Sequence, residues 1–460
     1  MRYVLGLLVL ILVVLGGAWL FAGRMGGPAI EFKQPEKFVG ASTPVEILVG
    51  APAPRLKTLT IAVEQNGKTF PVYSLGDAGA EVKEEGADVI RVTRTVGREN
   101  VPELKSGPAR ITVTASRPVL YGLRTLTGSA SKDVQVRLER PRVSVLSTHH
   151  FVNHGGAEAV VYRVTPDDVR SGVLVGDLEY PGYPARAAGL ANINITDPAV
   201  RVAFFALRHD QDLKTPIHVF ARDEAGNSAR ADFDYRVFPK PFKKSRIELA
   251  DSFLDRVVPA ILEGTREVNP TGDTLQKFLV INGELRRKNN EKIASFASQT
   301  APSILWNGAV FHPFTNTGVQ SAFADHRTYI YKGKDVDQQI HLGFDLASYA
   351  GTPIVAANRG KVLFAEELGI YGNTVIIDHG MGVQSLYAHL SSIDVKPGDM
   401  VEKEQQLGRS GMTGMAAGDH LHFTMLVNGQ MVNPVEWWDS HWIEDRILRK
   451  LRAAGAPTTQ

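Results

Sequence analysis

Apolar and polar positions alternate in short runs through much of the first half of the chain. Residues 28–140 contain such runs at 45–49 and 109–113, with Gly, Pro and Asn between them. A two-residue period predicts β-strands that bury one face, and short strands at this spacing predict a small β-sandwich. The runs in residues 141–239 predict a second, immunoglobulin-like β module, closed by a strand at 230–237.

The period lengthens to that of a helix between residues 245 and 299. Apolar residues from Ile247 to Ile261 fit one helical face, and Thr271 or Asp273 is expected to cap a second helix that extends to Phe296. Amphipathic helices usually bury their apolar face on their own chain, so this α-helical connector is interpreted as a packed spacer. A partner-binding arm and a lid over a site are the alternatives.

The C-terminal part returns to a β pattern. Residues 301–436 combine short apolar runs with frequent turn residues, and they predict a β-rich domain. Residues 437–460 predict an amphipathic helix and a tail. Its basic residues, Lys450 among them, are expected to form a solvated face.

The N-terminal segment, residues 1–24, has a different pattern. No charged residue lies between positions 3 and 23, and at about 1.5 Å per residue this stretch would span about 30 Å, the thickness of a bilayer core. We therefore expect an uncleaved signal anchor, with a cleaved signal peptide as the alternative. The charges on its two sides are nearly balanced and do not fix its orientation. We expect a single membrane pass with the large hydrophilic body of the protein outside the cytoplasm, which the charges alone do not show.

Composition narrows these expectations. A chain of 460 residues is too long for one core, and 43% hydrophobic with 22% charged residues is typical of a folded protein. The net charge of +2 does not favour nucleic-acid binding, and the absence of cysteine excludes thiolate zinc sites, disulfides and cysteine nucleophiles. The predicted fold class is mainly β: an N-terminal transmembrane helix, two immunoglobulin-like β-sandwich modules, a short α-helical connector and a C-terminal β-rich domain.

Candidate metal ligands occur in two short motifs. His341 and Asp345 are four positions apart, and His420 and His422 are two apart, which places both imidazoles on one face of an extended strand. Residues four apart are about 13 Å apart in an extended chain, so a zinc ion can bind His341 and Asp345 only if the chain bends. Gly343 lies at the midpoint, where a bend costs least. Two histidines and a carboxylate, with another histidine beside them, predict a catalytic zinc site with an open position for water.

The ordered motifs of the last third resemble a known enzyme family. His341-Leu-Gly-Phe-Asp is followed by Leu386-Tyr-Ala-His-Leu, by Gly408-Arg-Ser-Gly-Met-Thr-Gly and by His420-Leu-His-Phe. This order is similar to that of the lysostaphin-type (LytM-like) zinc endopeptidases, which cut peptidoglycan cross-bridges. The resemblance implies a lysostaphin-type metallopeptidase domain at 301–436. It also implies His341, Asp345 and His422 as Zn2+ ligands and His389 and His420 as catalytic histidines, with base and oxyanion roles undivided between the last two.

The sequence departs from the family pattern beside the last motif. Asp419 stands where proline is frequent, and Thr424 stands where an acidic residue is common. Neither position is a ligand, so these differences concern substrate preference. Asn316 and Arg327 are the candidates for the polar residue that shapes or occludes the groove in some relatives.

The resemblance implies a membrane-anchored zinc metalloendopeptidase that hydrolyses peptidoglycan stem peptides or cross-links, with D-Ala–diaminopimelate as the favoured bond. Its partners would be peptidoglycan, the inner membrane and a further envelope protein bound by the β modules. A catalytically silent regulator that binds peptidoglycan and activates another wall hydrolase is the alternative, although such proteins usually lose ligands. A non-haem iron oxygenase also uses two histidines and a carboxylate, but usually spaced as His-x-Asp.

Overall fold

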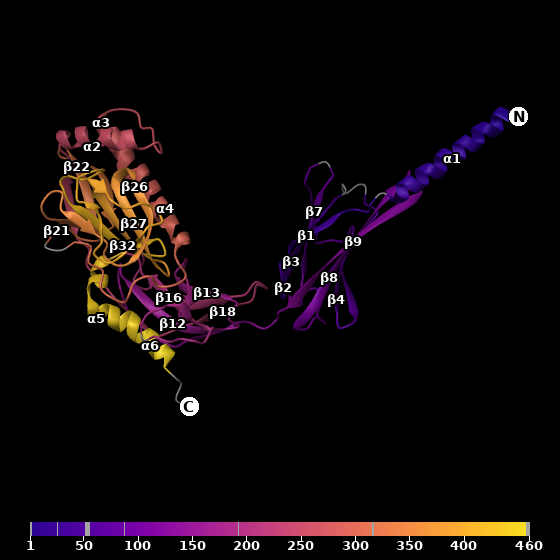
Figure 1. Ribbon diagram of the computed structural model, residues 1–460, viewed down its shortest axis with the longest axis horizontal. Coiled ribbons are helices and arrows are strands. Elements are labelled where there is room, and N and C mark those ends of the chain that lie inside the picture. The colour runs from indigo at the N-terminus through magenta and orange to yellow at the C-terminus, as the bar shows by residue number, and fades with distance from the viewer. Residues whose placement is uncertain are drawn as a thin grey trace. The chain divides into compact units, whose positions relative to one another are not determined.

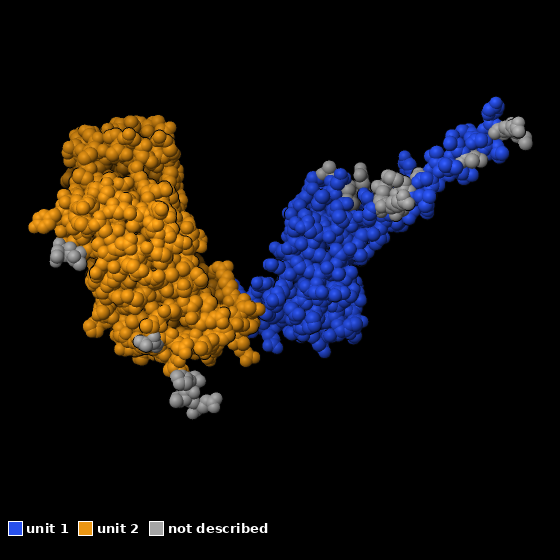
Figure 2. All heavy atoms as spheres, viewed as in Figure 1, with its two compact units in different colours: residues 1–141, 222–229 blue, residues 142–221, 230–460 orange. Residues whose placement is uncertain are grey.

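The computed structural model describes residues 2–24, 26–50, 56–86, 88–191, 193–314 and 317–456. The described part is mainly β, as predicted. It divides into two compact units (Figure 2): residues 1–141 with 222–229, and residues 142–221 with 230–460.

The first unit contains an N-terminal helix and two β-sheets. Its elements are α1 (Arg2–Arg24), β1 (Ile30–Gln34), β2 (Phe38–Val39), β3 (Thr43–Val49), β4 (Thr58–Gln65), β5 (Lys68–Ser74), β6 (Glu81–Glu84), β7 (Ile90–Val96), β8 (Gly107–Val119) and β9 (Arg124–Val136). The sheets have the orders β1-β3-β7-β6 and β2-β9-β8-β4-β5, and they share a core that includes Ile47 and Ile111. Within the residues that the structure describes, no helix is both long and apolar enough to cross a membrane.

A set of short strands opens the second unit. These strands are β10 (Arg142–Val145), β11 (His150–Asn153), β12 (Ala157–Thr165), β13 (Arg170–Val175), β14 (Leu178–Pro181), β15 (Tyr183–Pro184), β16 (Val200–Ala206), β17 (Ile217–Arg222), β18 (Ser228–Ala231) and β19 (Tyr235–Phe238). The prediction of one closing strand at 230–237 is wrong. Residues 232–234 lie outside any strand and separate β18 from β19, and β19 instead pairs in parallel with β11.

The connector begins with a strand. In β20 (Lys244–Glu248), Ile247 pairs with Tyr329 of β22 (Asp325–Tyr331), so the assignment of Ile247 to a helix is wrong. The backbone pairing with β22 outweighs the helical spacing of the side chain. The helical elements that follow are α2 (Asp251–Gly264), α3 (Thr274–Val280), η3 (Ile281–Leu285), α4 (Arg286–Ser295) and η4 (Phe296–Gln299). Asp273 caps α3 through a reciprocal capping box with Gln276, which confirms Asp273 as one of the two predicted caps.

The largest sheet of the second unit follows the connector (Figure 1) and has the order β21-β24-β32-β28-β27-β26-β30. Its strands are β21 (Gly318–Ser321), β24 (Phe344–Ala347), β26 (Gly360–Glu367), β27 (Asn373–Gly380), β28 (Val383–Leu390), β30 (Met400–Val401) and β32 (Leu421–Val427), with β33 (Gln430–Val432) paired to β32. Smaller sheets add β23 (Lys334–His341), β25 (Pro353–Val355), β29 (Ser392–Ile393) and β31 (Gln406–Arg409). One hydrophobic core is continuous from Val161 of β12 to Phe423 of β32.

The chain ends in the helical elements η6 (Pro434–Trp438), α5 (Ser440–Ile443), η7 (Glu444–Leu448) and α6 (Arg449–Gly455). The expectation that Lys450 is solvated is wrong. Its side chain is 4% exposed, and its Nζ lies 2.8 Å from Oε1 of Glu158 in β12. This ion pair contributes to the attachment of the C-terminal helix to the β module of the second unit.

Candidate metal centre

Neighbouring strands bring the candidate ligands together. His341 ends β23, and Asp345 lies in β24 directly opposite His422 of β32. The next strand, β28, places Ala388 opposite His422, and His389 follows at once in the chain. Because the sheet order is β24-β32-β28, residues that are far apart in the sequence meet at one place on the sheet.

Gly343 lies between β23 and β24, at the bend that the ligand spacing requires. A Cβ atom at this position would lie 2.4 Å from Nε2 of His422 and 2.9 Å from the carbonyl oxygen of Phe423. The bend at Gly343 is therefore confirmed. Glycine is also needed because the His422 ring packs directly against this backbone.

Three donor atoms converge on one point. His341 Nε2 lies 2.9 Å from Asp345 Oδ1 and 3.0 Å from His422 Nδ1, and His422 Nδ1 lies 3.1 Å from Asp345 Oδ1. Ligands of a tetrahedral zinc ion, each about 2.0–2.1 Å from the metal, are about 3.3 Å apart, close to these distances. All three residues are buried, and they form a group able to hold a metal ion.

Hydrogen bonds fix the orientation of these ligands. The His341 Nδ1–H group donates to the carbonyl oxygen of Ala322 at 3.1 Å, which leaves the lone pair of Nε2 directed at the other two donors. The Arg327 Nη2 group donates to Asp345 Oδ2 at 3.1 Å and to Ser321 Oγ at 2.7 Å. Oδ1 of Asp345 therefore remains directed at His341 and His422.

The arrangement fits a cation better than it fits a structural hydrogen-bond cluster. The lone pair of His341 Nε2 faces His422 Nδ1 and a carboxylate oxygen, and like-signed electron density at about 3 Å is unfavourable without a proton or metal between. Two imidazole nitrogens and one carboxylate oxygen are a donor set that binds Zn2+ and leaves a position open for water. The expected Zn2+ cofactor is confirmed by this convergence of His341, Asp345 and His422.

His389 and His420 stand beside the ligands. Their Nδ1–H groups donate to the backbone oxygens of Thr413 and Gly418, each at 2.8 Å, and their ring centroids are 4.8 Å apart. His420 Nε2 lies 3.5 Å from Asp345 Oδ1. In both rings Nε2 is thus left to exchange a proton with a bound molecule.

The environment shifts the pKa values of the site in different directions. Burial opposes ionisation of Asp345, but His341, His420 and His422 together hold its pKa well below the usual range. Burial lowers the pKa of His389 well below its usual value, and the neighbouring imidazoles add to this effect. Burial also lowers the pKa of His420, but the contact with Asp345 outweighs it and leaves that pKa raised.

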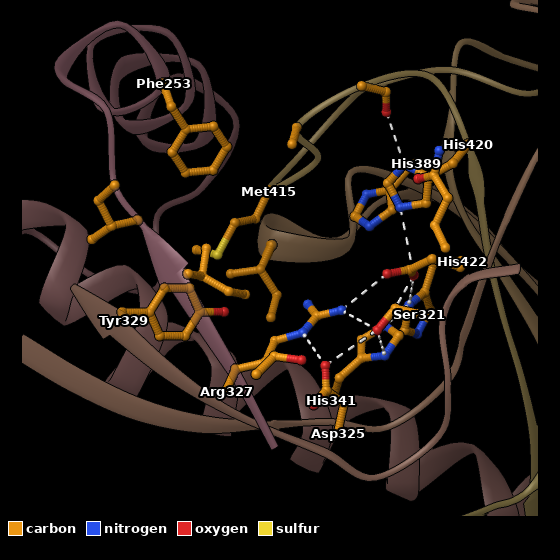
Figure 3. Close-up of a pocket in the computed structure, with 18 of the residues that line it drawn as sticks. Phe253, Ser321, Asp325, Arg327, Tyr329, His341, His389, Met415, His420 and His422 are labelled. Carbon is orange, nitrogen blue, oxygen red and sulfur yellow. Dashed lines mark hydrogen bonds and ion pairs between the residues drawn. The ribbon is translucent and has the colours of Figure 1, made fainter. Parts of the chain in front are cut away.

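The ligands line one end of a cavity of about 440 Å³ (Figure 3). Arg327, a candidate from the sequence, lines this cavity, whereas Asn316 lies outside the described residues. Ser321 contacts Arg327 and lies 3.3 Å from His341 Nδ1, and it was not predicted from the sequence. Phe253 and Met415, which line the same cavity, were not predicted as site residues either. No motif marks these residues, because each reaches the site only through the packing of its own segment.

Comparisons with known proteins agree with this geometry. Residues 339–434 match the model of Peptidase family M23. The chain is similar to the DD-carboxypeptidase/endopeptidase Mpg of Neisseria meningitidis, at 43% identity over 97 residues, which are 21% of this chain and 22% of that protein. It is also similar to the peptidoglycan DD-endopeptidase ShyA of Vibrio cholerae, at 40% identity over 96 residues, which are 21% of this chain and 22% of that protein.

Among solved structures, the catalytic domain of lysostaphin from Staphylococcus simulans is 29% identical and aligns over 26% of this chain and 90% of its own length, with a TM-score of 0.23. The chain spans about a fifth of the length of the curated relatives it matches. The matched segment contains the three converging ligands together with His389 and His420. Residues 339–434 of this chain form a Peptidase family M23 domain.

Proposed function

We propose that this protein is a membrane-anchored zinc endopeptidase that hydrolyses peptide bonds in peptidoglycan stem peptides or cross-links. The observation that carries the proposal is the complete set of His341, Asp345 and His422 at one end of a cavity, with His389 and His420 beside them. The names of the relatives, DD-carboxypeptidase/endopeptidase and peptidoglycan DD-endopeptidase, support peptidoglycan as the substrate. Within this proposal the D-Ala–diaminopimelate cross-link is the favoured bond.

The side chains have distinct tasks in this proposal. His341, Asp345 and His422 hold the metal, which when bound acts as a Lewis acid and lowers the pKa of water to about 7. His389 and His420 exchange protons at Nε2 with the attacking water and the leaving amine, because Nδ1 of each ring is held by a backbone oxygen. Arg327 keeps Asp345 in its ligand orientation through Oδ2.

The remaining parts of the proposal concern location. The uncharged stretch at 3–23 supports an anchor in the inner membrane, with the rest of the chain in the periplasm. The β modules would hold the peptidase domain away from the membrane, and they are also the surfaces for a further envelope protein. Alkaline extraction of cell membranes tests the anchor. If residues 1–24 anchor the protein, the full chain stays in the membrane pellet and a chain that starts at residue 26 does not.

Digestion of purified sacculi by the zinc-loaded protein tests the activity. We expect soluble muropeptides from the wild type and from His441→Ala, whose side chain is 93% exposed away from the cavity. We expect none from His422→Ala, which loses a ligand. His420→Ala should bind zinc but release no muropeptides. Intact sacculi after treatment with zinc-loaded wild-type protein would show that the proposal is wrong and would favour the silent regulator.

A further inference from the structure

A second cavity, of about 380 Å³, adjoins the cavity that contains the metal ligands. Its lining includes Arg286 and Arg287 at the start of helix α4 in the connector. Arg286 and Leu342 line both cavities, so the two spaces share a wall. Leu342 directly follows the ligand His341, and the Cα atoms of consecutive residues are about 3.8 Å apart. The second cavity therefore begins next to the metal centre.

Helix α4 lies one side chain away from a metal ligand. The Tyr371 hydroxyl donates to Asn290 Oδ1 of this helix at 2.8 Å. The Tyr371 ring packs edge-on against the His422 ring, and the two ring centroids are 5.5 Å apart. Arg286 precedes Asn290 by four residues, so both side chains lie on the same face of the helix. Arg286 is thus held on the side of the helix that faces the catalytic site.

Neutral groups hold the guanidinium of Arg286. Its Nε donates to the carbonyl oxygen of Asn282 at 3.0 Å, and its Nη2 lies 2.5 Å from Asn282 Oδ1 and 3.5 Å from Met415 Sδ. The Asn282 side chain is fully buried and donates to Asp337 Oδ2 at 2.7 Å. Figure 3 shows Met415 between Phe253 and the labelled histidines. The half-buried Arg286 therefore extends into the space beside the site with its orientation fixed.

This guanidinium has no anionic partner in the part of the chain that the structure describes. No carboxylate there lies within ion-pair distance of Arg286, and its Nη1 makes no hydrogen bond to a protein group. A half-buried charge is stabilised when an opposite charge binds it. Arginine binds a carboxylate well, because its planar group donates two parallel N–H···O bonds. Arg286 is therefore suited to an anion that comes from a bound molecule.

The remaining charges of the second cavity agree with this interpretation. Arg287 pairs with Glu291 at 2.6 Å, and Arg208 pairs with Asp210, so these two arginines are already neutralised. Arg208 and Arg287 line the second cavity together with Arg286, against the single carboxylate of Glu291. Apart from its histidines, the metal cavity has as many carboxylates as cations in its lining. The excess of positive charge is therefore on the side of the second cavity, and it includes Arg286.

We propose that Arg286 is a specificity-determining residue that binds a free carboxylate of the peptide substrate, away from the cleaved bond, where the two cavities meet. This inference rests on the proposed function and deepens it. The connector is then part of the substrate-binding surface, and it selects peptides that carry an anionic group near the cleaved bond. Residues 339–434 contain the metal ligands but not this arginine.

The test uses zinc-loaded full-length protein and two synthetic cross-linked peptides with the same cleavable bond. One peptide has free carboxylates on the residues around the bond, and the other has carboxamides in their place. We expect the wild type to favour the carboxylate peptide by about 10- to 100-fold in kcat/KM, mainly through KM, because the contact lies away from the reacting atoms. Arg286→Gln should bring this ratio close to one. Arg286→Lys should recover part of it, because lysine keeps the charge but not the paired N–H groups.

Two further variants keep the test interpretable. Arg287→Gln removes an exposed arginine of the second cavity, and it should lower the preference by about two- to fivefold even if Arg286→Gln folds poorly. Arg246→Gln is the matched control, because Arg246 is similarly exposed, pairs with Asp335 and lines neither cavity. It should keep the wild-type preference.

The outcomes separate this inference from the proposed function. If the wild type cleaves both peptides equally well, or if its preference is unchanged in Arg286→Gln and Arg287→Gln, the inference is overturned while the hydrolytic function stands. If the zinc-loaded wild type cleaves neither peptide, the proposed function is overturned and this inference with it.

Discussion

Among the described residues of the second unit, two clusters of buried charged side chains differ in how their charges are stabilised. In the cluster formed by Glu158 and Lys450, opposite charges lie 2.8 Å apart, Lys450 also donates to the Ala159 oxygen, and Glu158 accepts from the backbone N–H of Phe151. Each charge meets a complementary protein group. Burial raises the pKa of Glu158 and lowers that of Lys450, while the pairing opposes both shifts.

At the metal centre the donor atoms of His341, Asp345 and His422 face one another instead. Among the residues that the structure describes, no lysine or arginine pairs with these three donor atoms, and Arg327 contacts Asp345 at the outer oxygen Oδ2. The comparison teaches how to separate a structural ion pair from a metal site when both are buried. The pair of Glu158 and Lys450 is complete without a metal ion, whereas the three converging donor atoms favour a metal ion between them.

The largest expected effect comes from removing a ligand. Asp345→Asn keeps the shape of the side chain but removes its charge, so zinc affinity should fall by more than about 100-fold. This loss exceeds the one expected for a residue that contacts a ligand but not the metal. Competitive titration with a zinc chelator measures this affinity. Asp335→Asn is the matched control, since Asp335 pairs with Arg246 on an exposed part of the neighbouring sheet. Wild-type affinity in Asp345→Asn would contradict the ligand assignment.

A change in the cluster of Glu158 and Lys450 should lower the stability of the protein and leave zinc binding unchanged. Lys450→Met removes the 2.8 Å partner of buried Glu158 and leaves only the longer contact to Arg446 at 3.9 Å, so the free energy of unfolding should fall by about 3 kcal/mol while the folded protein still binds one zinc ion. Replacing both partners, as in Glu158→Gln with Lys450→Met, should recover much of the loss, because no charge then remains buried. Chemical denaturation with zinc analysis measures both quantities. A double variant no more stable than the single one would refute this account of the pair.

Glu436 offers a smaller, pH-dependent effect in the same region. Its carboxylate accepts from Asn153 Nδ2 and from the Ala157 N–H, each at 2.7 Å, but burial raises its pKa from 4.5 to about 7. The folded state therefore holds a proton that the unfolded state has released between pH 4.5 and about 7. Stability from this group should fall by about 3 kcal/mol as the pH rises through that window. Chemical denaturation of the wild type and of Glu436→Gln at several pH values checks this prediction. An equal dependence of the free energy of unfolding on pH in the two proteins would exclude the effect.

The smallest expected effect tests the contact outside the ligand triangle. Arg327→Ala releases Oδ2 of Asp345 and should weaken zinc binding by about 10- to 100-fold, less than the loss of a ligand. Arg327→Lys keeps the charge and should recover part of the affinity. Chelator titration again gives the affinity, and the unfolding midpoint shows whether the fold is intact. If zinc binds Arg327→Ala as tightly as the wild type, Arg327 does not position Asp345.

The sequence predicted the local features that depend on near neighbours in the chain. The alternating runs at 45–49 and 109–113 lie in strands β3 and β8, and the cap at Asp273 begins α3. The spacing of His341 and Asp345 required a bend, and Gly343 provides it. These features are set by the backbone and side chains of a few adjacent residues, so their pattern can be recognised without the fold.

The spacing of apolar and polar residues did not predict features that depend on pairing between distant segments. Ile247 has helical spacing but lies in a strand, because β22 offers it a hydrogen-bonding edge some eighty residues later. Lys450 was expected in solvent, but Glu158 lies opposite it on β12. Both outcomes depend on which surfaces meet after folding, and a local pattern carries no information about that.

The sequence by itself determined which side chains are available for chemistry: two motifs with side chains able to bind a metal, a bend between two of them and further histidines able to exchange a proton. Only the tertiary structure decided how these groups combine. The strand order β24-β32-β28 places Asp345 opposite His422 and His389 beside both, and strand β20 brings Phe253 to the same cavity. The physical reason is that side-chain type is local, whereas sheet order and packing are collective properties of the folded chain.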